Sequence, residues 1–361
     1  MAEQHNEAED TKVETSGLEP HERLIEPVAA VGDLFWGIDL GGTGIKVGLV
    51  DSAGETLAYG KIPTNQDAGP ADAVTRMGEL CRGLLQTLNG KSGGPLVADR
   101  IRRVGLGSPG PMDLAAGTLV SPPQLPDWWG FHLRDAVASE LRLPVTFLND
   151  ANAAAYGEFW RGSGREDNSM IMLTLGTGVG GGIIVEDMLI NGENSCGSEC
   201  GHMIVDPSPD ARLCIWGGGR GHLEAYASAS AVALRAAARL KEGAVSALEN
   251  VATPTALDVY NAASSGDPLA LEIVDETAHW LGVGVTSLVH AIDPASVVLG
   301  GAMNFGGDGD PVGERFRQGV WDEFESRTFP ALAAGTTIKF ATLGGDAGYI
   351  GVAGYAKKES Q

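Results

Sequence analysis

The feature that most constrains the fold is a pair of similar glycine-rich turns, each flanked by apolar segments. The strand, turn and returning strand are Leu34–Leu40, Gly41–Gly44 and Ile45–Asp51 in the first copy, and Met170–Leu175, Gly176–Gly181 and Gly182–Glu186 in the second. Apolar runs separated by glycine turns predict two β-hairpins. Because each hairpin opens one half of the 361-residue chain, the sequence predicts two related α/β halves with a cleft between them.

The remaining apolar patterns complete this organisation. Further strands are predicted at Thr56–Lys61, Ile101–Gly107, Pro144–Leu148 and Ser296–Leu299, and helices at Ala71–Leu88, Ala151–Trp160, Leu223–Leu240, Thr255–Ala263, Pro268–Ala291, Pro311–Arg327 and Asp346–Tyr355. The acidic, aperiodic residues 1–31 are predicted to be a disordered tail. We expect residues 32–150 and 151–345 to form two domains, and residues 346–361 to form a helix that packs back on the N-terminal domain.

Neither glycine turn has the context of a helix-opening nucleotide motif. The spacing Gly176-x-Gly178-x-x-Gly181 matches the dinucleotide-binding pattern, but that pattern needs a helix after the turn, and an apolar strand follows here. Gly90-Lys91-Ser92 resembles the end of a P-loop, yet Leu85 stands where the first glycine is required. The sequence therefore predicts neither a hydride transferase nor a P-loop enzyme.

A glycine turn between two strands has its own use in phosphate binding. Glycines let several backbone amides point into one concavity and let phosphate oxygens approach closely. Two such hairpins that face each other across a cleft would hold the phosphates of ATP, although an ordinary hairpin is the alternative interpretation of either turn alone. Asp39 would bind Mg²⁺ through water. The predicted contacts are Asp39, Gly41, Gly42, Thr43, Lys46, Gly176, Thr177, Gly178 and Gly180.

The charge of the chain limits its partners. Asp and Glu number 47 against 25 Lys and Arg, so the net charge is −22. This excess of acid argues against nucleic acid and anionic membranes, because phosphate neutralisation needs surplus Lys and Arg. No apolar run approaches the twenty or so residues that span a bilayer, and the polar start does not resemble a secretory signal. With four unevenly placed cysteines, we expect a cytoplasmic protein without a disulfide framework.

Three motifs together resemble the ROK family (repressors, open reading frames and sugar kinases). They are Asp39-Leu40-Gly41-Gly42-Thr43-x-x-Lys46, Leu148-Asn149-Asp150-Ala151-Asn152-Ala153-Ala154 and Gly176-Thr177-Gly178-Val179-Gly180-Gly181-Gly182. The resemblance runs from about Phe35 to Ala356. It implies the duplicated, ribonuclease H-like fold of actin-like ATPases, a hexose bound in the interdomain cleft, and ATP-dependent phosphorylation of the sugar. Gly300-Gly301 resembles the adenosine-side loop of the family.

The acceptor side of the reaction needs a base for the sugar hydroxyl. Asp150 is the natural candidate because it follows a predicted strand where α/β clefts form, although an Asn-Asp pair at a helix start is often an N-cap. The resemblance implies that Asp150 is the base and that Asn149 binds sugar hydroxyls. It further implies Glu199, His202 and Glu224 as sugar ligands, and a cleft-lining loop that contains Gly110.

The chain departs from the family pattern in a cysteine-rich segment. Many ROK kinases bind a structural zinc with Cys-x-Cys-Gly-x-x-Gly-Cys-x-Glu and an upstream His, but only Cys214 is kept here, and His222 stands in place of the third Cys. With His202 these residues would supply three ligands, short of the four of a closed zinc site. Loss of the site, with Trp216 packing locally, is the preferred interpretation, and a zinc bound by His202, Cys214 and His222 is the alternative.

The resemblance leaves several functions open. The segment Gly221–Ser228 looks most like glucokinases, so transfer to the 6-hydroxyl of glucose is expected, with fructokinase, mannokinase and N-acetylmannosamine kinase as rivals. A sugar-sensing regulator is another alternative, but the short acidic start does not suit a DNA-binding module. Polyphosphate is an alternative donor. A homodimer is expected from the family alone.

Overall fold

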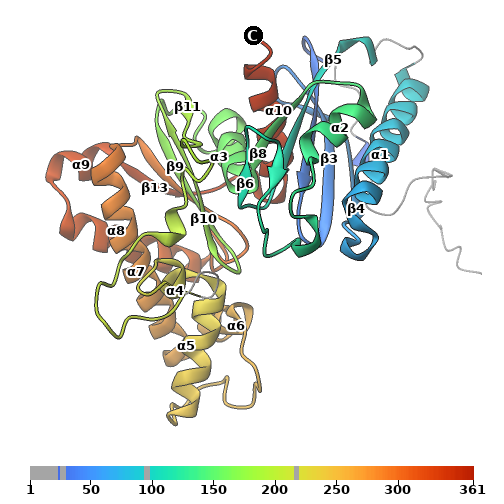
Figure 1. Ribbon diagram of the computed structural model, residues 1–361. Helices are drawn as coiled ribbons and strands as arrows, with labels where there is room; N and C mark the ends of the chain where they lie inside the picture. Colours follow the sequence, from blue (N-terminus) through green and yellow to red (C-terminus); the bar gives the residue numbers. More distant parts are fainter. Residues whose placement is uncertain (1–22, 25–29, 93–97, 215–218) are drawn as a thin grey trace, which may run out of the picture.

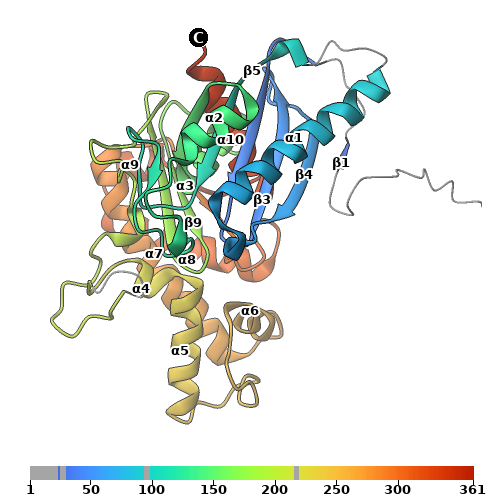
Figure 2. The same cartoon turned by 45° about the vertical axis from the view of Figure 1, so that its right-hand side comes forward.

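The protein is described by a computed structural model that covers residues 23–24, 30–92, 98–214 and 219–361. The predicted tail, apart from residues 23–24 and 30–31, lies outside these residues, as does Trp216. The described chain forms two large sheets with helices around them (Figure 1, Figure 2). No helix of the described chain is long and apolar enough to cross a membrane.

The first sheet has six strands in the order β1-β4-β3-β2-β5-β8, and the second has five in the order β11-β10-β9-β12-β13. The first comprises β1 (Arg23–Leu24), β2 (Leu34–Leu40), β3 (Gly44–Asp51), β4 (Thr56–Pro63), β5 (Ile101–Ser108) and β8 (Val145–Asn149). The second comprises β9 (Met170–Leu175), β10 (Val179–Val185), β11 (Met188–Leu189), β12 (Ser296–Gly300) and β13 (Thr337–Phe340). A separate small ribbon joins β6 (Met112–Asp113) to β7 (Thr118–Leu119).

The two sheets repeat one topology, which shows the duplication directly. In the first sheet, β2, β3 and β4 pair antiparallel in succession, β2 also pairs parallel with β5, and β5 pairs parallel with β8. In the second sheet, β9, β10 and β11 pair antiparallel in the same way, β9 pairs parallel with β12, and β12 pairs parallel with β13. The glycine turns join β2 to β3 and β9 to β10 in equivalent positions. Each sheet has its own apolar core, because largely separate sets of buried side chains pack on β2–β5 and on β9–β12.

Two helices lie between the sheets. α3 (Asp150–Arg161) contacts β10 of the second sheet, and α10 (Ala347–Lys358) packs on β2 and β5 of the first sheet and on α3 (Figure 1). Glycines make this packing close. A Cβ on Gly351 would lie 1.7 Å from the carbonyl oxygen of Ala153, and one on Gly37 of β2 would lie 1.9 Å from that of Tyr349. Larger residues at these positions would push the helices and the first sheet apart.

The other helices cover the outer faces. α1 (Gly69–Ser92) and α2 (Leu133–Leu141) pack on the first half, and α7 and α8 pack against each other in the second, where α5 and α6 extend away from the sheets (Figure 1). Their bounds are α4 Glu224–Ala227, α5 Ala229–Lys241, α6 Ala256–Ser264, α7 Pro268–Ile292, α8 Pro311–Arg327 and α9 Pro330–Gly335. Single 3₁₀ turns occur at η1 Gln66–Ala68, η2 Ala98–Arg100, η3 Pro126–Trp128, η4 Cys200–His202 and η5 Gly344–Asp346.

One predicted element is wrong in an informative way. The single helix expected over Leu223–Leu240 is two helices, α4 and α5, because Ser228 between them is extended, with φ −90° and ψ 165°. Its hydroxyl accepts a hydrogen bond from the backbone N–H of Ala231 at 3.1 Å, as an N-cap of α5. The domain limits at residues 150 and 345 stay predictions. They fall at the junction of β8 with α3 and within η5.

Candidate active site

A cleft of about 670 Å³ lies between the two halves, and side chains from both sheets line it. Most of the predicted site residues meet there: Asp39, Lys46, Gly110, Asn149, Asp150, Gly176, Thr177, Gly178, Gly180, Glu199, His202, Glu224 and Gly301. Gly41, Gly42, Thr43 and Gly300 are not among its lining residues. The turn η5 and the start of α10 line the cleft too, through Gly344, Gly345, Ala347 and Gly348, and sequence reasoning did not include these four residues in the site.

Asn149 and Asp150 stand at the junction of β8 and α3, and both line the cleft. The side-chain oxygen of Asn149 accepts hydrogen bonds from the backbone N–H groups of Ala151 at 2.9 Å and Asn152 at 3.3 Å, so Asn149 is the N-cap of α3. Its amide nitrogen faces Gly110 instead, since a Cβ there would lie 3.2 Å from it. The capping oxygen orients the side chain and leaves the NH₂ group available to donate to a ligand.

The carboxylate of Asp150 has an unusual pKa for an aspartate. Burial raises its pKa to about 6, and the nearby negative charges of Asp39 and Glu199 act in the same direction. A hydrogen bond from the N–H of Ala151 to Oδ1, at 2.8 Å, opposes the rise. A carboxylate with this pKa is ionised at neutral pH and accepts a proton more readily than an exposed aspartate does.

Asp39 and Lys46 occupy paired positions of the first hairpin, on β2 and β3. Burial raises the pKa of Asp39, and the charge of Lys46 lowers it. The ammonium group of Lys46 lies 3.4 Å from Oδ2 of Asp39 and 2.6 Å from the carbonyl oxygen of Gly345. Gly348 lies against the same carboxylate, since a Cβ there would be 2.6 Å from Oδ2. The carboxylate thus faces the cleft between β2 and the start of α10.

The second hairpin is held in place by the segment that starts α5. The carbonyl oxygen of Gly176 accepts from the N–H of Ala229, and that of Thr177 accepts from the hydroxyl of Ser230, both at 2.8 Å. Glu224 supports the same hairpin, because its Oε2 accepts from the N–H of Val179 at 3.0 Å. These bonds fix the position of the turn, whose residues Gly176, Thr177 and Gly178 line the cleft.

The predicted sugar ligands lie together at one end of the cleft. Glu199 and His202 are half-exposed, with Oε2 and Nε2 4.0 Å apart. Burial raises the pKa of Glu199, His202 lowers it, and Glu224 raises it. Glu224 is buried, and its Oε1 accepts a hydrogen bond from the thiol of Cys214 at 3.2 Å. Both Glu224 oxygens therefore already have protein donors, although each has capacity for one more.

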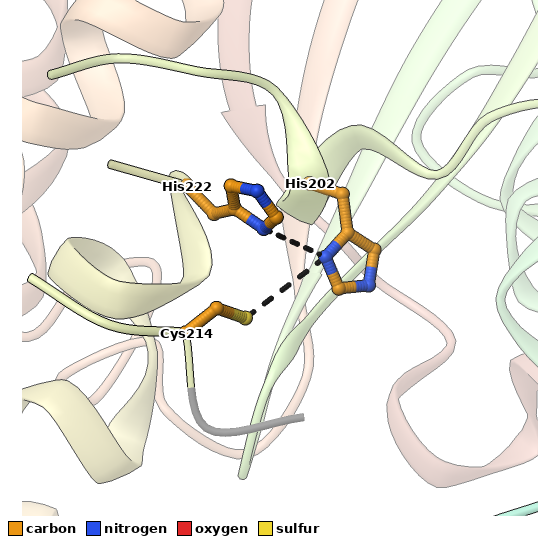
Figure 3. Close-up of side chains that lie close together, drawn as sticks. All are labelled: His202, Cys214 and His222. Carbon is orange, nitrogen blue, oxygen red and sulfur yellow. Dashed lines mark hydrogen bonds between the residues drawn. The ribbon is translucent and has the colours of Figure 1, made fainter. Parts of the chain in front are cut away.

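His202, Cys214 and His222 form a cluster of metal-binding side chains behind this end of the cleft (Figure 3). The Nδ1 atoms of the histidines are 3.1 Å apart, and Sγ of Cys214 lies 3.9 Å from Nδ1 of His202. One donor atom from each residue lies within 4.8 Å of the others. Three such donors fit zinc with one coordination position left over. Cys200, the nearest other cysteine along the chain to His202, is not in the cluster and packs on Gly181 instead.

Comparison with known proteins agrees with the motifs. A family model described as the ROK family matches residues 35–359. A glucokinase of Halalkalibacterium halodurans is 36% identical over 323 residues, which cover 88% of this chain and 93% of that protein. The chain belongs to the ROK family. Two solved structures of the family extend the comparison to the fold.

A ROK hexokinase from Thermus thermophilus matches with a TM-score of 0.74 at 29% identity, over 91% of this chain and 99% of that one. A ROK family glucokinase from Streptomyces griseus, in complex with glucose and AMPPNP, matches with a TM-score of 0.67 at 31% identity, over 90% and 99% of the two chains. With the repeated sheet topology, these matches confirm the predicted actin-like ATPase fold of two related halves.

Proposed function

We propose that this ROK protein is a glucokinase, which transfers the γ-phosphoryl group of ATP to the 6-hydroxyl of glucose. The observation that carries the proposal is the position of Asp150, whose pKa is raised to about 6, in one cleft with Asp39 and Lys46 of the first hairpin, the glycine turn of the second hairpin, and Glu199 and His202. The relatives named above support glucose as the acceptor and an ATP-type nucleotide as the donor.

In the proposed reaction, Asp150 accepts the proton of the 6-hydroxyl as the sugar oxygen bonds to the γ-phosphorus. The bond from that phosphorus to the bridging oxygen breaks, and ADP leaves. Asn149, Glu199 and His202 would orient the sugar through its other hydroxyls, and the hairpin amides would hold the phosphates. Mg²⁺, held by Asp39 through water, would neutralise charge on the phosphates. Closure of the cleft would exclude water that competes as the acceptor.

The charges of the cleft favour Mg-ATP over polyphosphate as the donor. Asp39, Asp150, Glu199 and Glu224 line it, and the ammonium group of Lys46 already contacts both Asp39 and a backbone carbonyl. A long polyanion would meet more carboxylates than cations there, whereas a nucleotide brings its own metal ion and binds through amides.

A coupled ADP-release assay tests the proposal, with Mg-ATP against glucose, mannose, fructose, N-acetylglucosamine and N-acetylmannosamine. We expect the highest kcat/KM for glucose, with the phosphate on the 6-oxygen in a phosphorus NMR spectrum of the product. Preference for another hexose would replace glucose by one of the rival kinases. Sugar binding without turnover by folded protein would instead favour a sugar-sensing regulator.

Three finer points belong to the same proposal. We propose a zinc ion at His202, Cys214 and His222, with Nε2 of His202 still free to contact the sugar, because the donor atoms lie within 4.8 Å of one another. Spacing along the chain alone favours loss of the site, whereas the proximity of the three donor atoms supports a retained one. A cytoplasmic location and a homodimer stay predictions.

A further inference from the structure

Glu158 is a fully buried carboxylate that neither the family motifs nor the cleft residues include. It lies on α3, eight residues after Asp150, and none of its surface is exposed. Oε1 accepts from the backbone N–H groups of Thr342 at 2.9 Å and Leu343 at 2.6 Å. Oε2 accepts from the N–H and hydroxyl of Ser163 at 2.8 and 3.0 Å, and from the hydroxyl of Thr342 at 3.2 Å.

The fold keeps room for this carboxylate. A Cβ on Gly162 would lie 2.0 Å from its Oε2. Five donors surround this one buried side chain, and three of them are backbone N–H groups, which can only donate. The side chain therefore holds two separate pieces of chain, the end of α3 and the segment at Thr342 and Leu343.

That segment leads directly into the nucleotide side of the cleft. Leu343 precedes Gly344 and Gly345, which line the cleft, and the carbonyl oxygen of Gly345 accepts from Lys46. Gly348, the second residue of α10, lies against the carboxylate of Asp39. The position of Leu343 thus sets where Gly345 and the start of α10 stand relative to the first hairpin.

We propose that Glu158 is a positioning residue for the nucleotide: it fixes the segment from Thr342 to Gly345 against the far end of α3, so that Gly345 and the start of α10 meet Lys46 and Asp39 in the geometry that binds the donor phosphates. The positions of the sugar-binding residues depend less on Glu158. Asp150 is about 12 Å away along the same helix, and Asn149 is held by its own capping bonds. The inference rests on the proposed function for the identity of the nucleotide.

Glu158→Gln tests this role, because the amide keeps the shape but has only one acceptor oxygen. Whichever way it turns, its NH₂ group faces either the N–H pair of Thr342 and Leu343 or the N–H of Ser163. We expect the Kd for Mg-AMPPNP, measured by calorimetry, to rise about tenfold, while the Kd for glucose changes less than twofold.

Asp267→Asn is the matched control, since Asp267 is a buried carboxylate that also accepts hydrogen bonds from backbone N–H groups, those of Ala247 and Ala270. It should lower the Tm without changing either Kd.

A second pair of variants decides the matter if Glu158→Gln does not fold. Thr342→Val and Ser163→Ala each remove one hydroxyl that donates to the same Oε2, the first on the nucleotide-side segment and the second at the end of α3. We expect Thr342→Val to raise the Kd for Mg-AMPPNP about threefold and Ser163→Ala to leave it unchanged. Equal effects of the two, or equal weakening of glucose and nucleotide binding in folded Glu158→Gln, would overturn the positioning role.

Nucleotide binding separates this inference from the proposed function. A wild-type protein that binds Mg-AMPPNP but phosphorylates no hexose would remove the kinase activity and still allow the Glu158 comparison. A wild-type protein that binds no Mg-AMPPNP would overturn both.

Discussion

The ammonium group of Lys46 lies 2.6 Å from the carbonyl oxygen of Gly345, which joins the first hairpin to the beginning of the C-terminal helix. The two residues are 299 positions apart in the chain. The same ammonium group lies 3.4 Å from Asp39, so one cation connects a strand, a carboxylate and a helix end at the proposed phosphate site.

Replacement of Lys46 by Met should weaken donor use. Hydrogen bonds to charged groups contribute about 1.5–3 kcal/mol, so we expect kcat/KM for ATP to fall roughly ten- to a hundredfold. Lys241→Met removes the same charge from the exposed end of α5 and should change kcat/KM less than twofold. Equal losses in the two variants would indicate a general effect of net charge.

Asp150→Asn should lower turnover strongly while making the protein more stable. A general base contributes about 10²–10⁴-fold to rate, so we expect kcat to fall by about that factor while the Kd for glucose changes by less than about threefold. The native pKa is raised from 3.8 to about 6, so at pH 7 the folded protein carries a charge that burial disfavours. The neutral isostere avoids this cost. The Tm of Asp150→Asn should therefore exceed the Tm of the wild type, and the difference should be larger at pH 7 than at pH 4.

Asp322→Asn, an exposed aspartate on α8, is the control for both measurements and should behave like wild type. Retained turnover in Asp150→Asn would remove Asp150 from the role of base.

The pH profile of the reaction should report the raised pKa of Asp150. The base must be ionised, so kcat/KM for glucose should fall about tenfold per pH unit below about pH 6. Glu199 raises this pKa through its charge, so Glu199→Gln should move the acid midpoint to lower pH, whatever it does to the maximal rate. A midpoint near 4 in the wild type would contradict the buried environment of Asp150.

The cluster of His202, Cys214 and His222 should bind one zinc ion per chain, measured by metal analysis after dialysis against zinc. Cys214→Ser and His222→Ala each remove a donor, and we expect the stoichiometry to drop well below one in both. Cys196→Ser changes an exposed cysteine outside the cluster and should retain the metal. A full zinc content in Cys214→Ser would show that the ion binds elsewhere.

The parts of the fold that could be read from the sequence are those with a strong local pattern. Both hairpins have apolar strands around glycine turns, and both were predicted. Two missed elements have weak patterns. α2 buries only Leu133 and Val137 and has no side-chain cap, and β13 is a four-residue strand with two buried side chains. The break at Ser228 was missed because neither glycine nor proline marks it.

The candidate site likewise contains residues that could be predicted from local motifs and residues that could not. Asp39, Asp150 and Glu199 stand within motifs and were predicted from them. The nucleotide-side contribution of Gly344 and Gly345 depends on contacts with Lys46 and Glu158, which are separated from that segment by 184 to 299 positions. Only the folded chain brings such distant residues together, so no pattern within a single stretch could have indicated it.

The packing of α10 on β2 and β5 has a consequence for biosynthesis. Gly37 and Gly105 leave a groove on the first sheet into which the backbone of Tyr349 and Val352 fits. While the ribosome is still making the second half of the chain, that groove has no helix to fill it, and its apolar neighbours face water. We therefore expect nascent chains that stop before α10 to bind chaperones, and release of the complete chain to be the event that allows the first domain to finish folding.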